Sequence, residues 1–211
     1  MTERGMIFNA EMVRAILDGR KTQTRRPVKF PVHDKNLGCE LAGNELAGEL
    51  SAGNYLNSAF GKPGDRIWVR ETFCPVDDTQ YGGEKWVDYR ATPRYEASHP
   101  AGWDSAPNDA EALKWRPSIH MPRWASRILL EITDVRVERL NSIHDVDAMR
   151  EGIQNLTTCS HADFGIPGVV NAQHPVRAFQ LLWESIYGAD SWRANPWVWV
   201  IEFKRVEGGA A

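Results

Sequence analysis

The chain has few of the features that mark disulfide-rich, metal-binding or membrane proteins. Its 211 residues include only three cysteines, which are widely spaced and form no CxxC pair, and its six histidines are dispersed. This pattern disfavours a disulfide framework and a cysteine-based zinc site. No apolar run approaches the length of a membrane span, and Met1–Arg4 begins no signal peptide. We expect a cytoplasmic protein that uses no metal or cofactor and binds no membrane.

Several common enzyme motifs are also missing. The sequence contains no serine-hydrolase elbow, no P-loop and no dinucleotide-binding glycine fingerprint. What the chain does have is a hydrophobic content of 42% and nine tryptophans, which indicate a folded globular protein. A length of 211 residues fits one elaborated domain with a sizeable core.

The most informative segment is Gly19–Arg26, which follows a predicted helix. Asn9 suits the N-cap of this helix, its apolar stripe predicts one buried face, and Gly19 suits the left-handed position after its end. The stripe consists of Val13, Ile16 and Leu17. Threonines at 22 and 24 favour an extended chain, which Pro27 closes. Alternation along a strand places Thr22, Thr24 and Arg26 on one face, with Lys21 at the turn leaning towards Thr24.

Four cations lie in this segment, although the net charge of the whole chain is −3. A basic run after a helix complements the helix dipole, so a solvated surface is one interpretation. The other is an anion site, because clustered cations attract phosphate or carboxylate groups. The charge asymmetry favours the anion site.

The rest of the chain predicts short strands and two more helices. Strands are expected at 66–70, 86–90, 127–139 and 197–206, and the strand at 127–139 changes parity near Thr133–Asp134, which indicates a β-bulge. Helices are expected from a Ser142 N-cap to Gly152 and from Pro175 to Gly188. Residues 197–201 are apolar on both faces, so this strand should be covered on both sides. The order of elements predicts an α+β fold with a small curled β-sheet or barrel and flanking helices.

A second candidate residue is Glu151, at the C-terminal end of its predicted helix. The helix dipole disfavours a carboxylate there, and burial would add to that effect, as a general acid requires. An exposed glutamate, or one paired with Arg150, is the alternative. Arg66, Trp68 and Arg70 on one predicted strand offer cations and a stacking ring to a ligand, or they belong to core packing and ion pairs.

Together these segments resemble the ASCH superfamily, whose domains are β-barrels similar to the PUA RNA-binding fold. Gly19–Arg26 resembles its G-x-K-x-x-x-x-R signature. Supporting segments are Gly64–Val69, Glu151–Ile153 and Trp197–Lys204, and Trp115–Trp124 is similar to ASCH-like proteins of bacteriophages and prophages. The resemblance implies a single PUA-like domain over residues 1–211 with insertions at about 28–60, 74–125 and 155–174.

One branch of the superfamily hydrolyses the N4-acetyl amide of N4-acetylcytidine to cytidine and acetate. Its catalytic lysine, threonine and glutamate fall on Lys21, Thr24 and Glu151 here. The resemblance implies Lys21 as base, Thr24 as nucleophile and Glu151 as proton donor to the leaving amine. Arg20, Arg25 and Arg26 are expected to lower the pKa of Lys21 or to hold an anionic ligand. The expected ligand-binding residues are Arg20, Arg26, Arg66, Trp68 and Arg70.

The chain departs from that branch in length, which is about twofold greater, and at Arg25, which replaces an apolar residue. The expected partner is a modified nucleoside or single-stranded RNA. Two alternatives to amide hydrolysis therefore stay open. One is a non-catalytic RNA-binding or nucleic-acid-binding module, and the other is an ASCH-type ribonuclease that uses His120 or the inserted loops.

Overall fold

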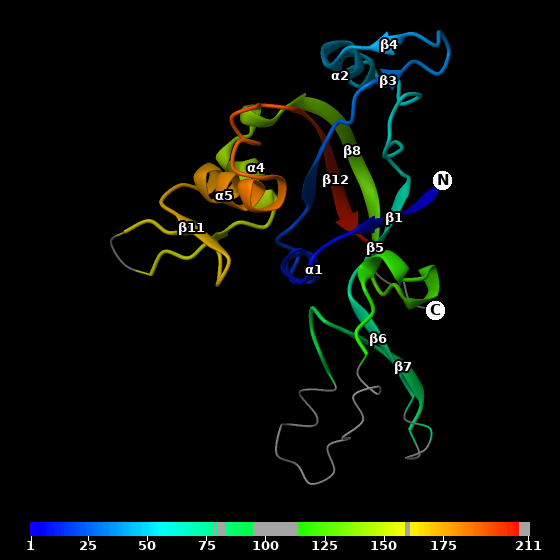
Figure 1. Ribbon diagram of the computed structural model, residues 1–211, viewed down its shortest axis with the longest axis vertical. Helices are drawn as coiled ribbons and strands as arrows, with labels where there is room; N and C mark the ends of the chain where they lie inside the picture. The colour runs from blue at the N-terminus through cyan, green and yellow to red at the C-terminus, as the bar shows by residue number, and fades with distance from the viewer. Residues whose placement is uncertain (78, 80–82, 95–113, 159–160, 207–211) are drawn as a thin grey trace.

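The protein has an α+β architecture built around one five-stranded mixed sheet (Figure 1). The computed structural model describes residues 1–77, 79, 83–94, 114–158 and 161–206. The strand order is β1-β5-β8-β12-β2, with β1 parallel to β5 and every other pair antiparallel. The strands are β1 (Glu3–Ile7), β5 (Arg66–Arg70), β8 (Leu129–Arg139), β12 (Trp197–Arg205) and β2 (Gln23–Pro27).

Helices cover both faces of this sheet. On one face, α1 (Ala10–Leu17) and α2 (Gly43–Ser51) share a hydrophobic core with Trp199, Ile201 and Phe203 of β12. On the other face, α4 (Asp145–Arg150) and α5 (Pro175–Tyr187) pack on Val198 and Val200. The last strand is therefore buried on both sides, which confirms the prediction from its continuous apolar run.

The change of parity in β8 is a β-bulge, as the sequence predicts. Opposite β12, Glu202 pairs with Asp134 and Phe203 pairs with Ile132, so Thr133 is the extra residue. Leu130 and Ile132 before the bulge, and Val135 and Val137 after it, all belong to the same core. One inserted residue thus resets the alternation and keeps both halves of the strand facing the α1 side.

Most predicted elements are found close to their expected positions. The first helix has Asn9 as its N-cap, with the Asn9 side chain accepting from the Met12 amide at 2.8 Å, and α5 begins at Pro175. The predicted Ser142 N-cap is wrong. Ser142 ends the 3₁₀ turn η4 (Leu140–Ser142), and α4 begins at Asp145.

Several smaller elements were not predicted from the sequence, whereas the strand predicted at 86–90 is found as β7 (Lys85–Tyr89). The predicted insertion at 28–60 contains α2 and a two-stranded ribbon, β3 (Val32–His33) with β4 (Glu40–Leu41). A hairpin of β6 (Phe73–Asp77) and β7 (Lys85–Tyr89) lies at the opposite end of the molecule (Figure 1). Residues 95–113 of the second predicted insertion lie outside the described residues. The short 3₁₀ turns η2 (Ser118–His120) and η3 (Arg123–Ala125) follow them.

A third small sheet accompanies α5. It consists of β9 (Gln154–Asn155), β10 (Phe164–Ile166) and β11 (Val170–Ala172), in the order β11-β10-β9. This sheet occupies the insertion predicted at about 155–174, and Ile166 contributes to the core beneath α5.

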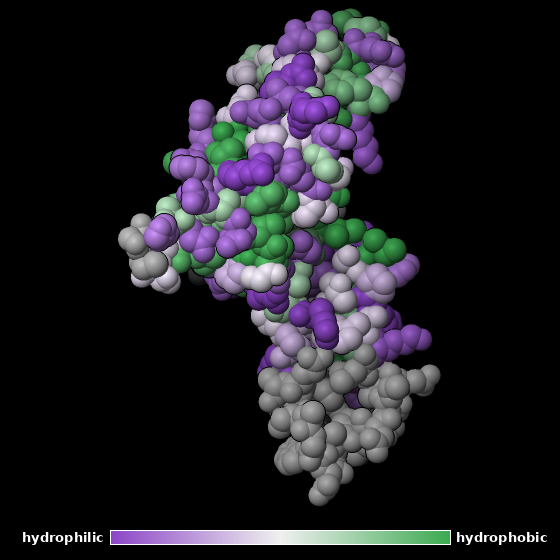
Figure 2. Space-filling model, turned by 60° about the vertical axis from the view of Figure 1, so that its left-hand side comes forward, coloured by the Kyte–Doolittle hydropathy of each residue, from purple (hydrophilic) through white to green (hydrophobic). Residues whose placement is uncertain are grey.

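The expected curled barrel is not found. Within the described parts of the chain the strands form one open five-stranded sheet and three small ones, and no strand pairing joins the edge strands β1 and β2. A side chain joins them instead, because Arg26 Nη2 donates to the Ile7 carbonyl at 2.7 Å. Hydrophobic and hydrophilic surface alternate over the face shown in Figure 2. No helix among the described residues is long and apolar enough to cross a membrane.

The bulge provides a test of this fold. Deleting Thr133 would move either the pair Leu130 and Ile132 or the pair Val135 and Val137 out of the core. We expect a loss of at least about 3–5 kcal/mol in the free energy of unfolding, comparable to truncating more than one core side chain. The measurement is urea denaturation. The control is Thr133→Ala, which changes an exposed side chain and keeps the number of residues in the strand, so its free energy of unfolding should stay close to that of the parent. An equal loss of unfolding free energy in the deletion and in Thr133→Ala would contradict the argument.

Candidate functional site

The turn between α1 and β2 forms as predicted, but Lys21 contacts Glu151 and does not lean towards Thr24 as expected. Gly19 has φ +74°, a left-handed conformation that glycine adopts without strain. The backbone amides of Arg20 and Lys21 both donate to the Ala15 carbonyl at 2.9 Å, which turns the chain back across the end of α1. Strand β2 begins two residues later, so Lys21 is free of the strand's alternation, and its side chain points into the protein.

Lys21 and Glu151 form a buried pair. The Lys21 ammonium donates to Glu151 Oε2 and to the Glu151 carbonyl, each at 2.8 Å. The two side chains are 0% and 3% exposed. The structure thus brings together two of the three predicted catalytic residues, which are 130 positions apart in the sequence.

Glycine at position 152 allows this approach. Gly152 has φ +108°, and an added Cβ would lie 3.3 Å from Ala15 Cβ and 3.6 Å from Lys21 Cβ. The Thr22 amide also donates to the Arg150 carbonyl at 2.9 Å, which fixes the end of α4 against the corner. The predicted helix end at Glu151 and Gly152 is therefore the contact surface for the basic corner.

Arg25 completes the cluster, in a role that the sequence analysis did not assign. Its guanidinium is fully buried and donates to Glu151 Oε1 at 3.1 Å and to Glu138 Oε1 at 2.7 Å. Asp147 Oδ2 lies 3.5 Å from Arg25 Nη2. The signal available in the sequence was the spacing of Asp147 and Glu151, which places two carboxylates on one helix face towards a shared cation.

Burial and the neighbouring charges shift the pKa of Lys21. Burial lowers the pKa of Lys21 from its usual value near 10.5, and the adjacent Glu151 carboxylate opposes this shift. The positive charges of Arg26 and Arg25 lower the pKa of Lys21 further. The expected repulsion between cations is thus present for Arg25 and Arg26, but loss of hydration is the larger cause, and Arg20 is not among the contributors.

Thr24 is placed differently from the other two predicted catalytic residues. It is buried and pairs with Ile201 of β12, so it belongs to the sheet face that carries the α1 core. Arg25 is the next residue and therefore points to the α5 face, where its guanidinium lies 6.0 Å from the ring centroid of Phe179. No hydrogen bond from Thr24 to Lys21 or Glu151 is found among the described residues.

The five predicted ligand-binding residues lie in three places. Arg20 donates to Asp18 at 2.9 Å and to the Gly152 carbonyl at 3.3 Å, beside the buried cluster. Arg26 contacts the Ile7 carbonyl and lies 5.5 Å from the Phe8 ring centroid. The remaining three alternate on the half-buried outer face of β5: Arg66, Trp68 and Arg70.

The outer face of β5 and the adjacent 3₁₀ turns carry the other predicted candidates. The Arg70 guanidinium lies 5.4 Å from the Trp68 ring centroid, and its Nε donates to the Ser118 carbonyl at 3.1 Å. His120 ends η2 and is exposed. Within the described chain, His120 has no hydrogen-bonded acid or nucleophile beside it. No group of three or more histidine, cysteine or acidic side chains in the described residues is arranged to hold a metal ion.

Comparisons of this chain with known proteins give no relatives. No protein-family model, no curated protein and no solved structure matches it. The structure itself therefore defines the class, which is an α+β protein with mixed sheets and a buried lysine–glutamate–arginine cluster where α1, β2 and α4 meet.

The cluster makes a prediction about stability. Replacing Glu151 with Ala leaves the Lys21 and Arg25 side chains buried without their shared carboxylate. We expect the free energy of unfolding to fall by about 3–5 kcal/mol, as when one partner of a buried ion pair is removed. Chemical denaturation at neutral pH measures the change. The matched control is Glu131→Ala, which removes a carboxylate from a surface pair with Lys204. An effect of Glu151→Ala no larger than that of the control would refute this view of the cluster.

Proposed function

We propose that the chain is a nucleoside- or RNA-directed protein of the ASCH type whose reactive centre is the Lys21–Glu151 pair. In its most concrete form, the pair hydrolyses the N4-acetyl amide of N4-acetylcytidine to cytidine and acetate. The observation that carries this proposal is the direct contact of 2.8 Å between Lys21 Nζ and Glu151 Oε2 in a buried setting. The resemblance of Gly19–Arg26 to the G-x-K-x-x-x-x-R signature of PUA-like ASCH domains supplies the reaction.

The pair has the chemistry that amide hydrolysis requires. A buried lysine with a lowered pKa is neutral in a larger fraction of molecules than a free lysine at the same pH, so it accepts a proton more readily. In the proposed step, Lys21 takes the proton of the attacking hydroxyl group, and the new C–O bond forms as the C–N bond breaks. Attack by water gives acetate directly, whereas attack by Thr24 gives an acetyl ester that a water molecule then hydrolyses to acetate. Glu151, in hydrogen-bond contact with Lys21, relays a proton to the departing exocyclic amine.

Burial sets a condition on this mechanism. Because the Lys21 and Glu151 side chains are 0% and 3% exposed, the amide reaches them only when the Lys21 side chain moves out of its contact with Glu151. Arg25 then keeps Glu151 in place through its own hydrogen bond, and Glu138 balances the charge of Arg25. The cluster thus provides a fixed carboxylate beside a lysine whose contact opens for substrate.

Lys21 variants test the reaction directly. Incubation with N4-acetylcytidine, followed by chromatography of cytidine, should show turnover in the parent and a loss of at least about a hundredfold in Lys21→Ala. Lys21→Arg is the matched control, because it keeps a cation for Glu151 and does not act as a base near neutral pH. It should be as inactive as Lys21→Ala while remaining folded. Absence of turnover in the parent, or full activity in Lys21→Arg, would refute the proposal.

The nucleophile is tested separately, since Thr24 lies on the opposite sheet face from Arg25. Turnover that is lost in Thr24→Val and kept in Thr24→Ser assigns the attacking hydroxyl to Thr24. Turnover kept in both variants assigns it to water. Both results are compatible with Lys21 as the base.

The pH dependence gives a further prediction with a defined sign. Because the pKa of Lys21 is lowered, its neutral form increases as the pH rises through that lowered value, and kcat/KM should rise with it and then level off. A pH–rate profile of the parent protein measures this. A rate that falls continuously from neutral to alkaline pH would exclude Lys21 as the base.

A non-catalytic RNA-binding module is the second candidate. The outer face of β5 favours it, since Arg66, Trp68 and Arg70 alternate on one face and Arg70 lies over the Trp68 ring. Such a surface binds phosphates and stacks bases.

This candidate predicts that affinity for single-stranded RNA falls steeply with added salt and weakens several-fold in Arg66→Ala. Fluorescence anisotropy with a labelled strand measures both effects. Arg193→Ala, at an exposed arginine between α5 and β12, is the control and should bind normally. Salt-independent binding, or equal losses in the two variants, would count against the β5 surface.

A further inference from the structure

A pocket of about 400 Å³ lies at the β2 edge of the central sheet, apart from the Lys21–Glu151 pair. It is formed by the end of β2, the segment that follows β2 up to the start of β3, the loop after α2, the last residue of α5 and the first half of β12. Its lining residues are Arg26, Pro27, Lys29, Val32, Asn57, Ala59, Phe60, Tyr187 and Trp199. Its size lies within the range of small-molecule sites.

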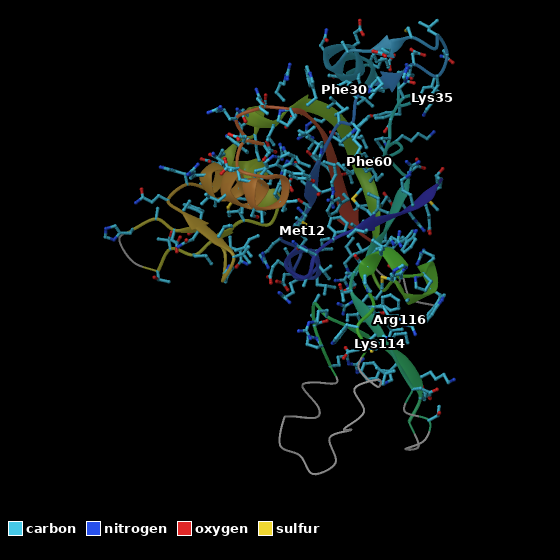
Figure 3. All side chains as sticks on the ribbon, viewed as in Figure 1. Met12, Phe30, Lys35, Phe60, Lys114 and Arg116 are labelled. Carbon is cyan, nitrogen blue, oxygen red and sulfur yellow. The ribbon has the colours of Figure 1, made fainter. Side chains whose placement is uncertain are left out.

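Aromatic rings form its walls. The rings of Phe60 and Trp199 lie edge to face, with centroids 5.7 Å apart and an interplanar angle of 72°. Trp199 is buried, and Tyr187 is held against Trp183 with ring centroids 4.3 Å apart. Figure 3 shows Phe60 beside the central sheet and Phe30 farther away, near α2. A planar ring is the ligand shape that such walls accommodate best.

Positive charge borders the same pocket. Arg26 and Lys29 are its only charged lining residues, and neither forms an ion pair with a carboxylate in the described part of the chain. Lys29 is exposed, so its ammonium is free to meet an anion. This arrangement contrasts with the cluster on the other sheet face, where Arg25 forms ion pairs with Glu138 and Glu151.

The pocket is also largely preformed. Asn57 is buried, and its amide is held by Glu49 at 2.8 Å and by the Lys35 backbone amide at 3.0 Å. The neighbouring Ala59 carbonyl accepts from Arg4 of β1. The loop that carries Phe60 is therefore fixed at both Asn57 and Ala59, and a ligand would not have to order it.

We infer that this pocket binds a nucleoside phosphate, with the base between Phe60, Trp199 and Tyr187 and the phosphate at Arg26 and Lys29. Aromatic walls together with unpaired cations and no lining acid match a planar ring that carries an anion. The same chemistry is offered by a free nucleotide and by one unstacked nucleotide of an RNA strand. Five of the lining residues belong to the segment 28–60, outside the parts of the chain that resemble the ASCH signature.

This inference stands apart from the proposed hydrolysis, because no lining residue belongs to the Lys21–Glu151 pair. Its readout is binding and not turnover. A failure of N4-acetylcytidine hydrolysis therefore leaves it untouched, and a failure of nucleotide binding leaves the hydrolysis proposal untouched.

Isothermal titration calorimetry of the full chain tests the inference. The probes are adenosine and cytidine 5′-monophosphates, the two parent nucleosides and a short single-stranded RNA. We expect a nucleotide to bind at least about tenfold more tightly than its nucleoside, which reflects charge-assisted hydrogen bonds to the phosphate. Binding of the RNA alone, lost in the variants below, identifies the strand as the source of the nucleotide. No binding of any probe, or equal affinities of nucleotide and nucleoside, would overturn the inference.

Two variants with matched controls locate the site. Phe60→Ala should weaken binding about tenfold or more by removing a wall of the base pocket, whereas Phe30→Ala, at an exposed ring outside the pocket, should not. Lys29→Glu should weaken the nucleotide more than the nucleoside, whereas Lys85→Glu on the β6–β7 hairpin should not. Thermal unfolding checks that Phe60→Ala is folded, and Lys29→Glu provides the test if it is not. Unchanged affinity in Lys29→Glu and in folded Phe60→Ala would exclude this pocket.

Discussion

The contact that organises this protein is the shared carboxylate of Glu151. One carboxylate oxygen accepts a hydrogen bond from Lys21 and the other accepts one from Arg25. The end of α4 is therefore attached both to the α1–β2 corner and to the edge strand β2. The Lys21, Arg25 and Glu151 side chains are buried, so bulk water does not reach them to replace a lost partner. The corner, the strand and the helix therefore hold their positions together, because separating any one of them exposes the others as unpaired charges in a low-dielectric interior.

Local signals in the sequence were enough to predict the elements that make this contact. Asn9 and Gly19 bound α1, Pro175 and Gly188 bound α5, and the parity change at Thr133 marks the bulge, because each depends on neighbouring residues only. The position of Glu151 at a helix end was predicted for the same reason. Its meeting with Lys21 was suggested by the family resemblance and not by any local pattern.

What the sequence did not predict depends on contacts between distant segments. The weak periodicity of residues 28–60 concealed α2, whose Leu46 and Leu50 are buried against the sheet. Arg25 was grouped with the other cations of the corner, although strand alternation gives it a different face and a structural role. The pocket walls come from Phe60, Tyr187 and Trp199, which no spacing rule links. The open sheet also differs from the expected barrel, since the edge strands β1 and β2 are not paired in the described part of the chain and are joined by the Arg26 side chain.

The consecutive arginines Arg25 and Arg26 on β2 point to opposite faces of the sheet. The charge of Arg26 on one face can therefore affect the protonation of Lys21 on the other. Arg26 borders the pocket, and its charge is also one of the causes that lower the pKa of Lys21 on the far side of the strand. An anion at Arg26 would offset that charge and raise the proton affinity of Lys21. By reciprocity, a proton on Lys21 would tighten the anion by the same factor. Anion binding in the pocket would thereby be linked to proton uptake by Lys21 across a single layer of the sheet.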